Sequence, residues 1–153
     1  MCLTEGKSNK NSNAQDKILE LIQNLDSWSF NKFAEYFLQK SGFAQVTITT
    51  RTKDSNIRGY GRYKINGMLG FTVAFQFQRY NNNPVDIDAI KCFRGSLTTD
   101  IEKAIFITTG TFSEEAKQEA FCFGKKWLDL MDAEDLITKI NELGISAKEL
   151  SAR

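Results

Sequence analysis

The N-terminal part of the chain contains two segments in which apolar side chains recur at helical spacing. Residues 16–25 predict a short helix, and residues 30–38 predict a second helix whose apolar side chains form one stripe facing a core. Ser27 or Ser29 is the expected N-cap of the second helix, because a serine hydroxyl accepts a hydrogen bond from a free N–H group of the first turn. Gly42 is expected to end it. The folded part of the chain therefore begins with two helices.

The pattern then changes to an alternation of apolar and polar residues, which is typical of strands. Residues 46–49 alternate, an Asn-Gly pair at 66–67 indicates a tight turn, and residues 72–80 alternate again. Because successive side chains of a strand point to opposite faces, Gln76 and Gln78 are predicted to share one face. This region predicts an antiparallel meander.

In the second half of the chain, helical and strand patterns take turns. Residues 85–97 predict a helix, residues 104–109 a buried strand, and Ser113 the start of another helix; residues 127–131 predict a short strand, and Asp132 is the expected cap of the final helix. The order α-α-β-β-β-α-β-α-β-α predicts an α/β fold. Its mixed central sheet combines the antiparallel meander with parallel strands joined by right-handed crossovers, and helices flank it.

Composition and length indicate one domain. The chain has 153 residues, 41% of them hydrophobic, and neither a repeat nor an interdomain linker is visible. Residues 1–14 are polar and predict a disordered lead, residues 15–147 a single domain, and residues 148–153 a tail. No stretch approaches the roughly 20 apolar residues of a membrane helix, and the polar start lacks the apolar centre of a signal peptide. The expected location is cytoplasmic, with no membrane partner.

The residue inventory limits the possible chemistry. Histidine is absent, which excludes serine–histidine and cysteine–histidine nucleophile pairs as well as histidine-based zinc sites. The cysteines Cys2, Cys92 and Cys122 are too far apart in sequence for a CxxC metal pair, so they are interpreted as reduced thiols, the latter two in the core. Catalysis, if any, would depend on carboxylates, lysine and a bound cation.

Charge is unevenly distributed although the net charge is only +1. Residues 51–94 contain eight basic and three acidic side chains, whereas residues 99–143 contain five basic and ten acidic ones. A basic middle segment indicates a side of the molecule that faces a polyanion, and solvated surface charge that happens to cluster is the alternative interpretation.

Several strings together resemble the catalytic domain of the Mrr-type restriction endonucleases, a branch of the PD-(D/E)XK nuclease superfamily. The strings are FQFQRY at 75–80, CFRGSL at 92–97, IFITTGTFSEEAKQEA at 105–120 and WLDLMDAEDL at 127–136. The resemblance extends over about residues 29–144 and implies a restriction-endonuclease-like fold. It also implies Mg²⁺-dependent hydrolysis of DNA phosphodiesters, with carboxylates holding the metal and a lysine assisting the nucleophile.

The resemblance places the family's catalytic positions on residues that have lost their charge or reversed it. The helix glutamate corresponds to Asn31, the main metal-binding aspartate to Arg58, and the Gln-x-Lys pair to Gln76 and Gln78. A guanidinium repels a divalent cation at the position where the cation would bind. We therefore expect no metal site and a catalytically degenerate nuclease that binds double-stranded DNA in defence or DNA handling. The residues expected to contact DNA are Arg51, Lys53, Arg58, Arg62, Lys64 and Arg79.

Two other interpretations remain open from the sequence. Glu35 or Asp54 would supply a relocated carboxylate in an active, Mg²⁺-dependent endonuclease, with Arg58 or Arg79 in place of the lysine; alternatively, Asp54 is a turn residue or an ion-pair partner of Arg58, and Glu35 is an exposed helix residue. A protein-interaction subunit that pairs with itself or with a partner nuclease, without touching DNA, is the third possibility.

Overall fold

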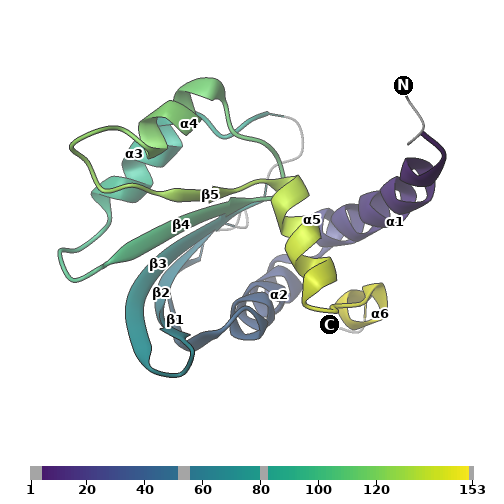
Figure 1. Cartoon of the computed structure of the whole chain (residues 1–153), viewed down its shortest axis with the longest axis horizontal. Helices are drawn as coiled ribbons and strands as arrows, with labels where there is room; N and C mark the ends of the chain where they lie inside the picture. The colour runs from purple at the N-terminus through teal and green to yellow at the C-terminus, as the bar shows by residue number, and fades with distance from the viewer. Residues whose placement is uncertain (1–4, 52–55, 80–82, 152–153) are drawn as a thin grey trace.

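The computed structural model describes residues 5–51, 56–79 and 83–151, which form a five-stranded sheet with helices on both faces (Figure 1). The strand order equals the sequence order, with β1 to β3 antiparallel and β3, β4 and β5 mutually parallel, as the sequence predicts. The strands are β1 (Phe43–Arg51), β2 (Asn56–Ile65), β3 (Leu69–Gln78), β4 (Lys103–Thr108) and β5 (Asp129–Met131). The helices are α1 (Glu5–Asn24), α2 (Ser27–Lys40), α3 (Ile87–Gly95), α4 (Glu114–Ala120), α5 (Ala133–Glu142) and α6 (Ala147–Ser151).

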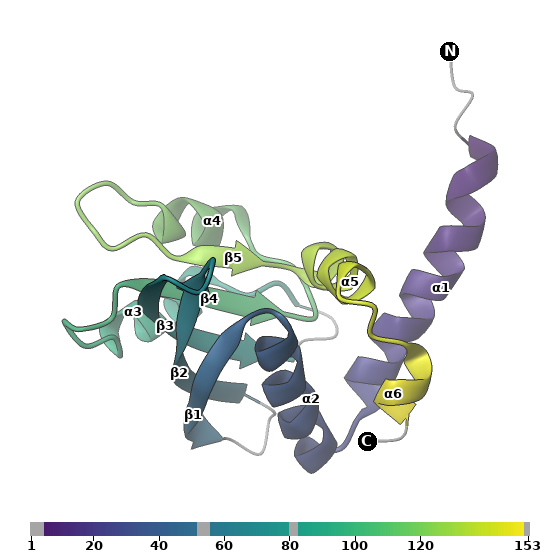
Figure 2. The ribbon, with the colours of Figure 1, turned by 60° about the horizontal axis from the view of Figure 1, so that its bottom comes forward.

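The sheet separates two apolar cores. One core joins α1, α2, α5 and α6 to the face of β3 that carries Phe75 and Phe77. The other joins α3 and α4 to the opposite face, through Ala74 of β3 and Phe106 of β4. Figure 2 shows α3 and α4 on one side of the sheet and α2 on the other. Helices α3 and α4 pack over the β3–β5 side of their face, so part of the same face above β1 and β2 stays open.

Local chemistry explains the turn and most of the caps. Asn66 and Gly67 both have positive φ angles, 53° and 70°, as an Asn-Gly hairpin turn requires. Ser113 and Asp132 cap α4 and α5 as predicted, and Asp132 forms a capping box with Asp135. The N-cap of α2 is Asp26, not either serine: its Oδ1 accepts from the backbone N–H of Ser29 at 2.7 Å. A carboxylate is an acceptor at least as good as a hydroxyl, and its charge favours the helix N-terminus.

Other differences from the sequence expectations concern helix ends and the cysteines. Helix α1 begins at Glu5, inside the segment for which no regular structure was predicted, and α6 covers part of the expected tail. Cys92 is exposed and Cys122 is half-buried, so their expected core placement is wrong. The buried positions of α3 are Ile90 and Phe93, and Cys92 lies off that stripe. Among the described residues, none of the helices is both long and apolar enough to cross a bilayer.

Strand β1 bends where it pairs with β2. The register shifts between Ala44 and Thr47 and again between Ile48 and Thr50, and Gln45 has a positive φ of 54°. Such bulges bend a strand and increase its twist. A Cβ on Gly59 would lie 2.1 Å from the backbone oxygen of Thr47, so only glycine fits this close approach. The bend shapes the open part of the sheet, where the candidate site lies.

Candidate functional site

The site is built around a chain of hydrogen bonds on β2 and β3. The register places Arg58 opposite Gln76, so both side chains lie on the face away from α2. Nε of Arg58 donates to Oε1 of Gln76 at 2.7 Å, and Nε2 of Gln76 donates to Oε1 of Gln78 at 3.3 Å. Gln76 and Gln78 are only 4% and 7% exposed, and the prediction that they share a face is confirmed. Buried amides need such partners, because an unpaired buried polar group costs about 1–3 kcal/mol.

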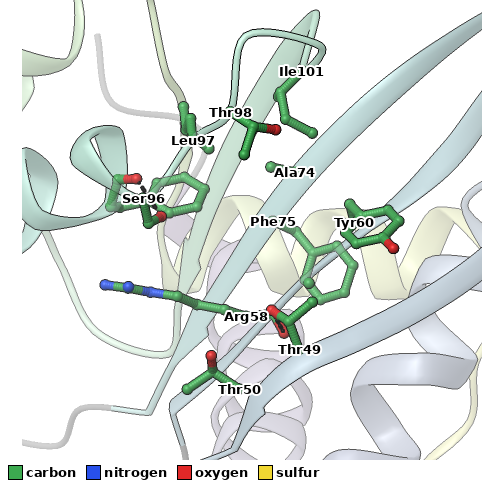
Figure 3. A pocket seen from close by; sticks show the side chains of 12 residues that line it. Thr49, Thr50, Arg58, Tyr60, Ala74, Phe75, Ser96, Leu97, Thr98 and Ile101 are labelled. Carbon is green, nitrogen blue, oxygen red and sulfur yellow. Dashed lines mark hydrogen bonds between the residues drawn. The ribbon is translucent and has the colours of Figure 1, made fainter.

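The other end of Arg58 reaches α3. Its Nη2 donates to the sulfur of Cys92 at 3.4 Å, so the side chain bridges from β2 to the helix that covers the neighbouring part of the sheet. Figure 3 shows Arg58 extending along one side of a cavity, with Thr50 of β1 below it and Ser96 across from it. The cavity has a volume of ≈ 290 Å³ and lies between the open part of the sheet and the segment that follows α3. Arg58 therefore forms part of its wall.

The donor set around Arg58 does not fit Mg²⁺. Magnesium binds oxygen ligands, usually with one or two carboxylates among them. Here the amide oxygen of Gln76 already accepts from a guanidinium, whose positive charge opposes a cation. Asn31 is half-buried on α2, the helix packed against the opposite face of the sheet. Over residues 5–51, 56–79 and 83–151, no three acidic, histidine or cysteine side chains gather as metal ligands would.

The alternative carboxylates give little support to a relocated catalytic site. Glu35 forms an ion pair with Arg51 at 3.4 Å, and the two side chains are 31% and 55% exposed. Such exposed pairs contribute about 0–1 kcal/mol. Asp54 and Lys53 lie outside the described residues, as does the ion pair considered between Asp54 and Arg58.

Three of the predicted DNA contacts follow one another on a single face of β2. Arg58, Arg62 and Lys64 alternate along the strand, with Tyr60 between the two arginines and 43% exposed. Nη1 of Arg62 donates to Oγ1 of Thr72 at 2.9 Å, which holds that arginine against β3, while Lys64 is exposed. We refer to Arg58, Arg62 and Lys64 as the basic strip; Arg51 lies at the end of the neighbouring strand.

Arg79 is positioned for a different role. Its Nη1 donates to the backbone oxygens of Ile22 (3.3 Å) and Leu25, and its guanidinium lies 4.8 Å from the ring centre of Phe30. Burial lowers the pKa of Arg79, while the charge of Asp26 opposes that shift. The side chain thus satisfies carbonyl groups at the end of α1, where a cation is favoured. It does not belong to the basic strip.

Another arginine holds α3 in place beside the site. Nη1 of Arg94 pairs with Oε1 of Glu119 at 2.7 Å, and Nε donates to the backbone oxygen of Lys126 at 3.1 Å. Lys125 pairs with the same carboxylate at 3.0 Å. The hydrogen bond from Lys125 and the charges of Lys125 and Arg94 lower the pKa of Glu119. These contacts join α3 to α4 and to the segment before β5.

Sequence reasoning missed the residues that complete the cavity. Its wall on the α3 side is formed by Phe93, Ser96, Leu97, Thr98 and Ile101. Three of the six residues of the CFRGSL string, which carries part of the family resemblance, lie here, but their spacing alone gave no role to them. Thr49 and Thr50 of β1 complete the opposite side.

Solved structures show which class of protein this fold defines. The chain resembles the DNA modification-dependent restriction endonuclease AspBHI, with a TM-score of 0.70 and 17% identity over 91% of this chain and 38% of that chain. It also resembles the MspJI restriction endonuclease, solved in complex with a 27-mer oligonucleotide, with a TM-score of 0.58 and 13% identity over 90% of this chain and 33% of that chain. At these identities the likeness shows the fold, which is that of restriction endonucleases.

The family follows from the sequence match. Residues 22–140 match the Mrr_cat family model, described as restriction endonuclease, and the chain therefore belongs to this family. No curated protein sequence matches it. The predicted family and fold class are both confirmed, and together they support a DNA-related role. The chain spans little more than a third of the length of its structural neighbours.

Proposed function

We propose that this chain is a DNA-binding member of the Mrr restriction endonuclease family that has lost phosphodiester cleavage and acts in defence or DNA handling. The observation that carries the proposal is the hydrogen bond from Arg58 to Gln76. This bond joins two positions that the family resemblance assigns to the metal site. A positively charged guanidinium stands where the resemblance places a carboxylate that would bind a cation. A guanidinium at this place attracts the phosphate that a metal ion would otherwise meet.

The basic strip supports binding of a double-stranded polyanion. Arg58, Arg62 and Lys64 lie on one face of β2, and Lys91 is exposed on the neighbouring α3. Contacts of this kind bind phosphates and carry no base specificity. Binding is therefore expected to weaken steeply with salt, with a slope of roughly −0.9 per neutralised phosphate in a plot of log K against log [salt].

Plasmid cleavage is the first test of the lost activity. Supercoiled plasmid, methylated and unmethylated, is incubated with the purified protein in Mg²⁺ and in Mn²⁺. We expect no conversion to nicked or linear DNA in either metal. Cleavage that copurifies with the protein and disappears with a chelator would contradict the proposal and favour an active enzyme with relocated carboxylates.

Restoring the family residues gives a second, independent test. The double variant Arg58→Asp, Gln78→Lys rebuilds the family's charges at two of the substituted positions, so isothermal titration is expected to detect Mg²⁺ or Mn²⁺ uptake that the parent protein lacks. Equal titration curves for the variant and the parent would count against the assignment of these positions.

DNA binding is measured by fluorescence anisotropy of a labelled duplex across a salt series. Lys64→Gln is expected to weaken binding and to lower the salt slope by about 1. Lys148→Gln, on the exposed side of α6, is the matched control and should leave both unchanged. Absent or salt-insensitive binding would favour a protein-interaction subunit instead.

A further inference from the structure

The cavity beside Arg58 combines three kinds of surface: apolar, hydroxyl-bearing and cationic. Its inner wall is apolar, formed by Ala74, Phe93, Leu97 and Ile101, and Tyr60 lies at its rim, 43% exposed. Hydroxyl groups border it on both sides, from β1 and from the segment after α3: Thr49, Thr50, Ser96 and Thr98. Among the described residues that line the cavity, Arg58 alone is charged, and none is acidic.

Arg58 retains hydrogen-bonding capacity toward this space. Its Nε bonds to Gln76 and its Nη2 contacts Cys92, whereas Nη1 has no hydrogen-bond partner within the described parts of the chain. The bond to Gln76 holds the guanidinium in one orientation, which favours binding of an oxyanion with little loss of side-chain freedom. Three of the hydroxyls already donate to neighbouring oxygens: Ser96 to Phe93 at 2.6 Å, Thr49 to the backbone of Arg58 at 3.4 Å, and Thr98 to Asp100. Their oxygens remain as acceptors.

The combination matches the parts of one nucleotide. A phosphate needs a cation, the faces of a base need apolar or aromatic walls, and the edge of a base needs hydroxyl or amide partners. A site for a phosphate alone would need no apolar wall, and a purely apolar pocket would need no arginine. The volume of ≈ 290 Å³ lies just below the range for ligand pockets, about 300–1,000 Å³, and so suits a small ligand.

We propose that this cavity accepts a single nucleotide unit, with its phosphate on Arg58 and its base between Tyr60 and the apolar wall at Phe93 and Leu97. This inference rests on the proposed DNA binding, and it adds that one nucleotide leaves the base stack and enters the protein. The same chemistry would also accept a free nucleoside monophosphate, which the experiment distinguishes from a nucleotide in DNA.

The test uses a duplex that carries 2-aminopurine, whose fluorescence increases when the base leaves the stack. Protein binding is monitored by the anisotropy of a second label on the duplex. We expect binding to raise the 2-aminopurine emission several-fold. Thr50→Trp places a bulky side chain at the rim on an exposed strand position that tolerates an aromatic residue, and it should abolish the rise. Thr138→Trp, exposed on α5 and remote from this cavity, is the matched control and should keep it.

Tyr60 supplies a second variant pair that does not depend on filling the cavity. Tyr60→Ala is expected to reduce the fluorescence rise at least threefold, and Tyr60→Phe to restore it, because the ring and not the hydroxyl contacts the base. Thermal unfolding confirms that each variant is folded before it is compared.

The outcomes separate this inference from the proposed function. Salt-dependent duplex binding without a rise in emission, or a rise that persists undiminished in folded Thr50→Trp, would overturn the nucleotide site and leave DNA binding intact. Calorimetric binding of deoxynucleoside monophosphates without duplex binding would support the cavity as a free-nucleotide site and overturn the proposed function. Binding of neither ligand would overturn both.

Discussion

The two faces of β3 differ in what they are made of and in what they do. One face presents Phe75 and Phe77, which are buried in the core beneath α2, and Phe77 contacts Phe30 and Phe37 of that helix edge to face. The other presents Gln76 and Gln78, which continue the hydrogen-bond chain from Arg58. The apolar face depends only on side-chain size and spacing. The polar face depends on particular functional groups, so the chemistry of this face is separable from the fold that carries it.

The largest effect is expected on the apolar face. Phe77→Ala removes a ring that is 1% exposed and lies 6.3 and 6.0 Å from the rings of Phe30 and Phe37. The loss should lower the free energy of unfolding by about 3–5 kcal/mol, because the packed core cannot close the cavity completely. Urea unfolding measures it. A loss below about 1 kcal/mol would show that this face does not dominate stability.

A smaller effect is expected on the polar face. Gln76→Leu leaves Nε of Arg58 and Oε1 of Gln78 without their present partners and should cost about 1–3 kcal/mol. In the double variant Arg58→Leu, Gln76→Leu, the loss should be smaller than the sum of the two single losses, because both members of the bond are absent. Urea unfolding of the four proteins gives the coupling. Strict additivity would contradict the role of this bond.

The sequence predicted the two faces of β3 more fully than the site between the elements. Alternation from 72 to 80 places Phe75 and Gln76 on opposite faces because a strand has a fixed period, and the caps at Ser113 and Asp132 follow from local chemistry. The cavity combines Thr50, Arg58 and Thr98, and no local pattern reports which distant segments meet.

Arg79 illustrates the same limit for charged residues. Its position in a basic segment predicts a contact with DNA, whereas its side chain binds carbonyl oxygens at the end of α1. A long basic side chain can turn toward solvent or along an apolar surface, and its neighbours in space decide between these. The sequence therefore gives the residue types that are available for a site, while the direction of each side chain required the tertiary structure.

An effect on stability that is confined to acid pH is expected at Asp26, the N-cap of α2. Hydrogen bonds from the backbone and side chain of Ser29 hold the pKa of Asp26 below its usual 3.8. A carboxyl whose pKa is lowered on folding stabilises the protein above the unfolded pKa and loses that contribution as the pH falls through the folded pKa. Asp26→Asn keeps a cap but cannot titrate, so its stability should fall less than that of the parent below about pH 4.

Thermal unfolding between pH 6 and pH 2 measures this difference. Asp16→Asn is a control because that carboxyl is exposed and caps no helix in the structure. Parallel curves of stability against pH for the parent and Asp26→Asn would show that ionisation of Asp26 does not contribute to stability.

The smallest effect on stability is expected at the Arg51–Glu35 pair. Arg51 is 55% exposed and Glu35 31%, so solvent screens the pair, and Arg51→Ala should change the free energy of unfolding by less than about 1 kcal/mol. If Arg51 contacts a phosphate, the same variant lowers the salt slope of DNA binding by about 1. A large stability loss with an unchanged salt slope would assign Arg51 to folding and remove it from the binding surface.

The contacts of Arg94 have a consequence for how the cavity is used. Because that arginine fixes α3 to Glu119 and to the backbone of Lys126, the wall that carries Phe93 and Ser96 is already in place before any ligand arrives. A nucleotide that enters as proposed would meet a preformed cavity and lose little free energy to the ordering of the protein. For the proposed nucleotide, selectivity would then come from how well its shape matches this wall.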